Sequence, residues 1–171
     1  PYDDVLPYNS GLMLNTPLHF RSKAYDLRKA GFQMCTHAIG DSANRVILDI
    51  YGEVVGDLAD HRWRIEHAQV VHQDDMGKFA KYHVIPSVQP THATSDMPWA
   101  EKRLGPERIR WAYAWRSLKD AGVRLVLGSD FPVEKPDAMD GLYAAVTRQD
   151  ASGQPEGGWY ASEALTAYEA L

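Results

Sequence analysis

Short apolar runs alternate with segments of helical periodicity along most of this chain. In residues 42–55, for example, Val46, Ile47, Ile50 and Val54 recur at the spacing of one helix face. The apolar runs have the length of strands, and most of them end in polar residues. The predicted helices are residues 18–30, 42–55, 73–82, 108–121, 138–149 and 162–171. The predicted strands are 32–41, 62–69, 84–90 and 123–130, and the predicted loops are 91–107 and 150–158.

Strands that alternate with helices predict βα units and a parallel sheet. Two architectures fit this order, a doubly wound open sheet and a (β/α)8 barrel. No glycine-rich phosphate loop of the type GxGxxG or GxxxxGK[ST] follows a predicted strand, which argues against a nucleotide-binding open sheet. Polar residues at the strand ends favour the barrel, because a barrel builds its site at that face. We therefore expect an α/β fold in which this chain supplies roughly half of a barrel, about four βα units.

Composition excludes several classes of protein. The chain has 171 residues, 24% of them charged, and a net charge of −5 without a basic cluster, so no nucleic-acid partner is expected. No signal peptide is visible, and no apolar run approaches the roughly 18 residues that span a membrane. The single cysteine, Cys35, lies in an apolar run and is predicted to be a buried, inert thiol. That usage suits a reducing compartment, and we expect a cytoplasmic protein.

Three residues at predicted strand ends carry the candidate chemistry. His37 and His67 lie 30 residues apart, about one βα unit, and Asp130 lies 63 residues beyond His67, about two units. All three would then point into one barrel mouth. Two imidazoles and a carboxylate suit Zn²⁺ or a similar divalent metal. The spacing alone leaves open the alternative that each histidine is a hydrogen-bonded structural residue.

Further polar residues are expected near the same mouth. His92 and Gln89 follow the third predicted strand and would contact substrate or satisfy the loop backbone. Asp41 would cap the helix that follows it or take a catalytic role. Glu66 alternates to the other face of its strand from His67, and we expect it to form an ion pair, with Arg64 or with a cation on a helix, rather than bind metal.

Five motifs together resemble one known family: HAIGD (37–41), RIEHAQ (64–69), QPTHATSDMPWAEKRLG (89–105), YAWRSLKDAG (113–122) and GSDFPVE (128–134). The sequence looks like the YtcJ-like branch of the metal-dependent amidohydrolases, which includes N-substituted formamide deformylase-type enzymes. The resemblance covers nearly the whole chain. It implies a (β/α)8 TIM barrel with a small β-sandwich beside it, of which this chain would supply roughly strands five to eight.

The resemblance also implies a role for each site residue. His37 at the end of strand five and His67 at the end of strand six would bind the metal. Asp130 at the end of strand eight would bind metal and act as the catalytic base, while His92 and Gln89 would contact substrate. The implied reaction is the attack of metal-activated water on a C–N bond of an amide or formamide, with one or two ions, zinc above all.

Other features of the family are not in this sequence. Its HxH pair on strand one, its acidic or carboxylated-lysine ligand on strand four and most of its β-sandwich would precede Pro1, and Ser42 stands where the family usually has Arg. Since the chain begins at Pro1 and stops at Leu171 inside a predicted helix, we expect residues 1–171 to be the C-terminal half of an amidohydrolase barrel. Alone, such a piece is expected to bind metal weakly and to hydrolyse nothing efficiently.

Two functions from different classes remain open at this stage. The first is an amidohydrolase with a small-molecule amide substrate and no nucleic-acid or membrane partner; homo-oligomers are left open. The second is a non-catalytic homologue that keeps the fold and acts by binding or in regulation. Retention of His37, His67 and Asp130 together favours the enzyme, because a binding protein has no need of all three.

Overall fold

A four-stranded parallel sheet forms the centre of the molecule. The computed structural model describes residues 2–4, 9–56 and 58–171. The strands are β1 (Cys35–Ala38), β2 (Arg64–His67), β3 (Ile85–Val88) and β4 (Val126–Leu127), in the order β1-β2-β3-β4 with every pairing parallel. Strand order and direction are those of consecutive βα units in part of a TIM barrel, which confirms the predicted fold class. The sheet edges among the described residues are β1 and β4.

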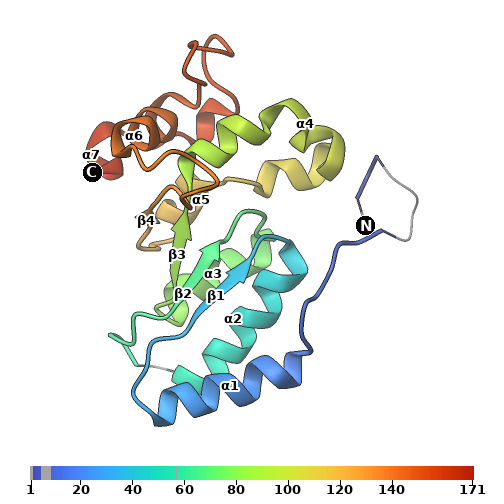
Figure 1. The fold of residues 1–171 in the computed structure, drawn as a ribbon, viewed down its shortest axis with the longest axis vertical. Helices are drawn as coiled ribbons and strands as arrows, with labels where there is room; N and C mark the ends of the chain where they lie inside the picture. The colour runs from blue at the N-terminus through green and yellow to red at the C-terminus, as the bar shows by residue number, and fades with distance from the viewer. Residues whose placement is uncertain (1, 5–8, 57) are drawn as a thin grey trace.

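Helices pack against the sheet and beyond its carboxyl edge (Figure 1). The α-helices are α1 (Pro17–Lys29), α2 (Asp41–Val55), α3 (Gln73–Lys81), α4 (Pro90–Arg108), α5 (Trp115–Asp120), α6 (Ala138–Thr147) and α7 (Ala167–Ala170), with 3-10 turns η1 (Ile109–Trp111) and η2 (Ala161–Glu163). Helices α4, α6 and α7 gather at the end toward which the β3 arrow points. No helix in the described ranges is long and apolar enough to cross a membrane.

Among the described residues, the core consists of two clusters of buried side chains. One joins α1, α2 and α3 to strands β1 and β2, and its largest members are Trp63, Tyr51 and Phe79. The other joins α4 and α6 to β3 and the C-terminal segment, around Trp115 and Trp159. The predicted helical periodicity of 42–55 is confirmed, because Ile47 and Ile50 are buried in α2.

The predicted loop 91–107 is wrong, because residues 90–108 form helix α4. Pro90 occupies its first turn, where the missing N–H costs nothing. The buried Ala93, Ala100 and Leu104 and the partly buried Met97 recur at helical spacing, a signal that the polar residues and prolines of this segment obscured. The helix is kinked at Gly105, whose φ of 73° is left-handed.

Three other sequence predictions need correction. The predicted helix 108–121 is reduced to η1 and α5, because Tyr113 between them has a φ of 52°. The predicted strand 123–130 pairs only at Val126 and Leu127. Cys35 is exposed rather than buried, because it shares the His37 face of β1, whereas Thr36 and Ala38 face the helices.

His61 is held as a neutral imidazole where β2 begins. Its Nε2 lies 2.7 Å from the carbonyl oxygen of Tyr82, and its Nδ1 accepts a hydrogen bond of 2.8 Å from the N–H of Trp63. Burial lowers the pKa of His61 below its usual value. A proton on Nδ1 would also break the bond from Trp63.

This environment predicts a loss of stability in weak acid. Since the pKa of His61 is lower in the folded state, the unfolded chain takes up the proton first as the pH falls. The stabilisation by neutral His61 is therefore complete above about pH 6.5, and it is lost as the pH drops through the folded-state pKa of His61. Urea unfolding at a series of pH values measures it. In His61→Gln the free energy of unfolding should depend less on pH over this range, and an unchanged slope would contradict the assignment.

Candidate metal centre

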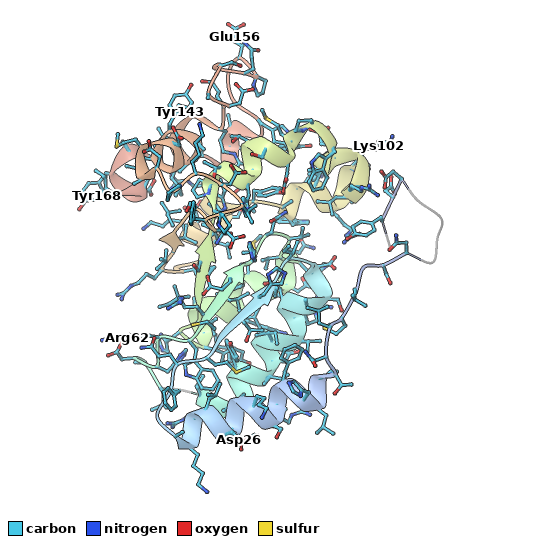
Figure 2. The ribbon with its side chains drawn as sticks, in the orientation of Figure 1. Asp26, Arg62, Lys102, Tyr143, Glu156 and Tyr168 are labelled. Atoms are coloured by element: carbon cyan, nitrogen blue, oxygen red, sulfur yellow. The ribbon has the colours of Figure 1, made fainter. Side chains whose placement is uncertain are left out.

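The candidate residues lie at the carboxyl edge of the sheet. In Figure 2, Arg62, which precedes β2, lies at the lower left of the view, and Lys102 on α4 lies at the upper right. His67 is the last residue of β2, His92 is in the first turn of α4, and Asp130 follows β4 by three residues. Because parallel strands all end at this edge, residues far apart in sequence converge there.

His67, His92 and Asp130 form one group of ligand-type side chains. One ligand atom from each lies within 4.8 Å of the other two. Oδ2 of Asp130 is 4.0 Å from Nε2 of His67 and 4.0 Å from Nε2 of His92. The two imidazole rings are stacked, with centroids 5.7 Å apart and an angle of 10° between their planes.

His37 lies beside this group. Its ring centroid is 4.5 Å from that of His67, in an edge-to-face arrangement. His37 itself pairs with Glu66 across the sheet and shares its face. The structure thus places His37 beside His67, but the described ligand atoms that converge within 4.8 Å are those of His67, His92 and Asp130, without His37. His92, expected at the same mouth, lies as far from Asp130 as His67 does.

Two of the site residues, His67 and Asp130, have left-handed backbone, as does Ala68 after His67. His67 has a φ of 75°, Ala68 a φ of 43° and Asp130 a φ of 58°. Left-handed backbone at non-glycine residues costs about 1–3 kcal/mol each and clusters at functional sites. The change of direction at His67 ends β2, and its ring lies beside His37 although strict alternation would place the two on opposite faces.

The electrostatic setting keeps His67 in its neutral form. Burial lowers the pKa of His67, and the neighbouring His37 and His92 lower it further, while Asp130 acts in the opposite direction. His67 is therefore neutral near pH 7, as a metal ligand must be. Nδ1 of His67 and Nε2 of His92 are buried without a hydrogen-bond partner, which is costly for a polar atom unless another partner satisfies it.

These residues fit a divalent metal ion. Neutral imidazoles and a carboxylate are the donors that Zn²⁺ takes in hydrolytic sites. Two ligands of a tetrahedral zinc lie about 3.4 Å apart, so the observed separations of 4.0 Å require shifts of only a few tenths of an ångström. The donor His92 Nε2, orphaned in a buried position, is the kind of atom that such an ion satisfies.

The other expected polar residues have hydrogen-bond partners within the protein. Gln89 is buried, and its Nε2 donates to the carbonyl oxygen of Ser87 at 3.1 Å. Glu66 pairs with Arg64 at 3.0 Å, as expected.

Asp41 begins α2, and Gly40 rather than Asp41 is the N-cap. The Asp41 carboxylate accepts from the backbone N–H of Ser42 at 2.8 Å and from Nε of Arg108 at 3.1 Å. The carboxylate thus joins the start of α2 to the end of α4.

Sequence reasoning missed a partly buried polar network beside the centre. It consists of Gln69, Asp96 and Tyr113, whose side chains bond to one another. Asp96 follows His92 by one helical turn, and a loop at residues 91–107 does not predict this relation.

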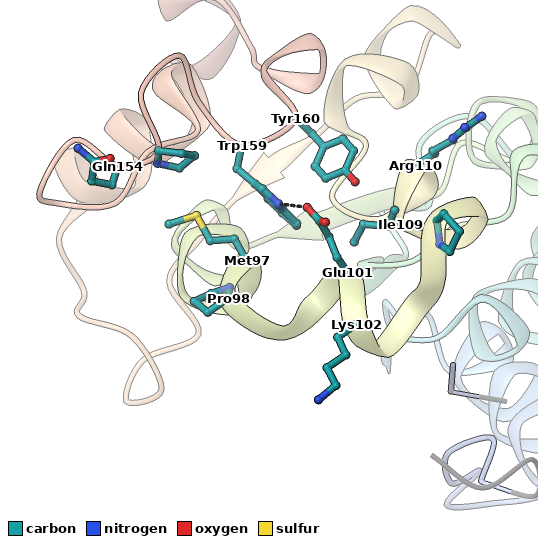
Figure 3. Close-up of a pocket in the computed structure, with 11 residues that line it drawn as sticks. Met97, Pro98, Glu101, Lys102, Ile109, Arg110, Gln154, Trp159 and Tyr160 are labelled. Carbon is teal, nitrogen blue, oxygen red and sulfur yellow. Dashed lines mark hydrogen bonds between the residues drawn. The ribbon is translucent and has the colours of Figure 1, made fainter. Parts of the chain in front are cut away.

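A groove of about 1000 Å³ lies outside the candidate centre (Figure 3). It runs between α4, η1 and the segment 154–160, and Nε1 of Trp159 donates to Glu101 within it at 3.0 Å. Neither His67, His92 nor Asp130 lines this groove, so it is not the mouth that holds the ligand-type side chains.

Comparison with known proteins agrees with the geometry. A family model described as "Amidohydrolase family" matches residues 5–171. The chain belongs to this family. Its resemblance to the YtcJ-like branch is supported by the Bacillus subtilis protein YtcJ, whose name assigns it to the amidohydrolases and which is 31% identical over 171 residues, 100% of this chain and 32% of YtcJ.

Two further similarities extend this result. Protein LONG AFTER FAR-RED 3 of Arabidopsis thaliana is 36% identical over 169 residues, 96% of this chain and 28% of that protein. The crystal structure of an uncharacterized metal-dependent hydrolase from Pyrococcus horikoshii superposes with a TM-score of 0.86 at 31% identity, over 99% of this chain and 33% of that one. This amidohydrolase-family chain thus spans about a third of the length of its relatives.

Proposed function

We propose that this chain supplies half of the metal centre of a hydrolase that cleaves a C–N bond of an amide or formamide. The observation that carries the proposal is the convergence of His67, His92 and Asp130 within 4.8 Å at the carboxyl edge of the sheet, with His37 beside them. Membership of the amidohydrolase family and likeness to a metal-dependent hydrolase support it.

Each residue has a proposed task. His37, His67 and Asp130 hold a divalent cation, most simply zinc. Such an ion lowers the pKa of a water molecule and polarises a carbonyl oxygen. Asp130 accepts the proton of the attacking water at a carboxylate oxygen, which its 41% exposed side chain leaves accessible. His92 and Gln89 contact the substrate.

A second assignment follows from the distances, in which His92 is itself a ligand. Its Nε2 is as close to Asp130 as that of His67 is, and it lacks a hydrogen-bond partner. In this arrangement His37 would face the substrate. The two assignments share His67 and Asp130 and differ in which histidine the metal needs.

We propose that the whole protein is a longer barrel in which residues 1–171 form the C-terminal half. Relatives about three times as long and the open edges β1 and β4 support this arrangement. The remaining ligands would come from the other half. The isolated 171-residue chain should therefore bind zinc weakly.

Paired variants of the full-length protein test the site and the assignment together. His37→Ala is expected to lower zinc affinity by about 10-fold or more, because a ligand is lost, whereas His92→Ala should mainly raise KM. Zinc affinity is measured by competition with a chromophoric chelator, and turnover with a panel of formamides, cyclic amides and N-acyl compounds.

The outcomes separate the alternatives. If His92→Ala lowers zinc affinity and His37→Ala mainly raises KM, His92 is the ligand. Full-length protein that binds no divalent metal would overturn the metal centre. Metal binding without hydrolysis of any compound in the panel would instead favour the non-catalytic homologue.

A further inference from the structure

The turn that carries His67 is strained and must be held by its surroundings. His67 and Ala68 are consecutive non-glycine residues with left-handed backbone. Such residues persist only where neighbouring structure over-determines them. The next residue, Gln69, connects this turn to the rest of the structure through hydrogen bonds.

Gln69 is bound through both its backbone and its side chain. Its carbonyl oxygen accepts from the N–H of Tyr113 at 2.7 Å, and an antiparallel bridge between Val70 and Ala112 continues the pairing. Its Nε2 donates to Oδ2 of Asp96 at 3.1 Å and to the Tyr113 hydroxyl at 2.5 Å.

Tyr113 and Asp96 complete the network. The Tyr113 hydroxyl donates to Oδ2 of Asp96, which accepts from Gln69 as well. Tyr113 is 3% exposed, and its backbone carbonyl oxygen accepts from Arg148 at 3.0 Å. Burial and the Asp96 carboxylate raise the pKa of Tyr113, so the phenol keeps its proton and remains a donor.

The network joins the two segments that carry the buried histidines. Gln69 lies two residues after His67 in the turn that ends β2, and Asp96 lies one helical turn after His92 on α4. Loss of the bonds among Gln69, Asp96 and Tyr113 would therefore free the strained turn and α4 to move relative to each other.

We propose that Asp96, held by Tyr113 and Gln69, is a positioning residue that keeps His67 and His92 at the separation a metal ion requires. The inference rests on the metal centre proposed above. It adds residues that touch neither metal nor substrate and act through the two histidines.

Cobalt binding to the full-length protein tests this role. Tyr113→Phe and Asp96→Asn remove parts of the network, and each is expected to weaken Co²⁺ affinity by about 10- to 100-fold. The visible absorption bands of bound Co²⁺ should also shift, because they report ligand geometry, which a change in stability alone does not alter. Tyr143→Phe on α6 is the matched control, because it removes an exposed hydroxyl that bonds to Gln149. It should change neither the Co²⁺ affinity nor the absorption bands.

The outcomes keep the two proposals apart. If the wild-type protein binds no Co²⁺ or Zn²⁺, the metal centre itself fails. If the wild type binds Co²⁺ and both folded variants match its affinity and spectrum, only the positioning role is overturned. If Asp96→Asn does not fold, Tyr113→Phe decides; loss of the fold in Tyr113→Phe, judged by far-ultraviolet circular dichroism, would make the network purely structural and would also overturn the inference.

Discussion

Asp130→Asn in the full-length protein is expected to abolish measurable hydrolysis and to leave the fold largely intact. The amide cannot accept the proton of the attacking water and is a poorer metal ligand than a carboxylate. Loss of a general base alone lowers kcat by about 10²- to 10⁴-fold. The fold should persist because the Asp130 side chain is 41% exposed and its Oδ2 lies 4.0 Å from Nε2 of His67 and of His92, beyond hydrogen-bond distance.

The matched control is Asp137→Asn. Asp137 is an exposed carboxylate seven residues further on, and its Oδ1 caps α6 by accepting from the N–H of Met139 at 2.9 Å. Asparagine caps a helix about as well as aspartate, so activity and stability should both be retained. Initial rates on the best amide substrate and thermal unfolding measure the two properties. Full activity in Asp130→Asn would remove Asp130 from the base role.

The strand ends were within reach of sequence reasoning. An apolar run that ends in a polar residue marks the edge of a buried strand, and parallel strands end at one edge, so His37, His67 and Asp130 could be grouped without coordinates. Neither the left-handed backbone of His67 nor its contact with His37 could be predicted. Both arise from bonds to segments more than 25 residues away, such as the one between Gln69 and Tyr113.

Helix α4 marks the limit of the local pattern. The prolines and polar residues of 91–107 are typical of a loop, but the sparse apolar positions Ala93, Met97, Ala100 and Leu104 pack on the second core cluster. Tertiary packing of this stripe outweighs the weak local propensity. His92 and Asp96 consequently lie on a helix rather than in a loop. A prediction of a loop for this segment cannot give their relative positions.

The same helix joins the segments that follow three strands. Arg108 bonds to Asp41 after β1 at 3.1 Å, and Asp96 bonds to Gln69 after β2 at 3.1 Å. Ser95 donates to Glu134 after β4 at 2.7 Å. The mouth is therefore assembled by one helix that spans it, and this explains how residues from separate βα units are held together although only a short sheet supports them.

Asn44→Asp is expected to destabilise the fold by about 3–5 kcal/mol near pH 7. Asn44 is fully buried in α2, and its Nδ2 lies 3.0–3.2 Å from the carbonyl oxygens of Ala38, Ile39, Gly40 and Val70. It thereby ties the loop after β1 to the segment after β2. A carboxylate oxygen in place of Nδ2 would face these carbonyl oxygens without a proton to donate. Among the described residues, the hydrogen-bond partners of the Asn44 side chain are all carbonyl oxygens, so none of them is a cation that could pair with the new charge.

The pH dependence of this loss distinguishes a buried charge from a packing defect. Burial raises the pKa of the introduced carboxyl above its value in the unfolded chain. The stability of the variant relative to wild type is therefore highest below about pH 4, and it falls as the pH rises through the folded-state pKa of the new carboxyl group. Urea unfolding across this range measures the deficit relative to wild type, and Asn15→Asp, the same change at an exposed position, should show almost none. A deficit that does not grow with pH would mean that Asn44 fills space at this junction but does not satisfy its carbonyl oxygens.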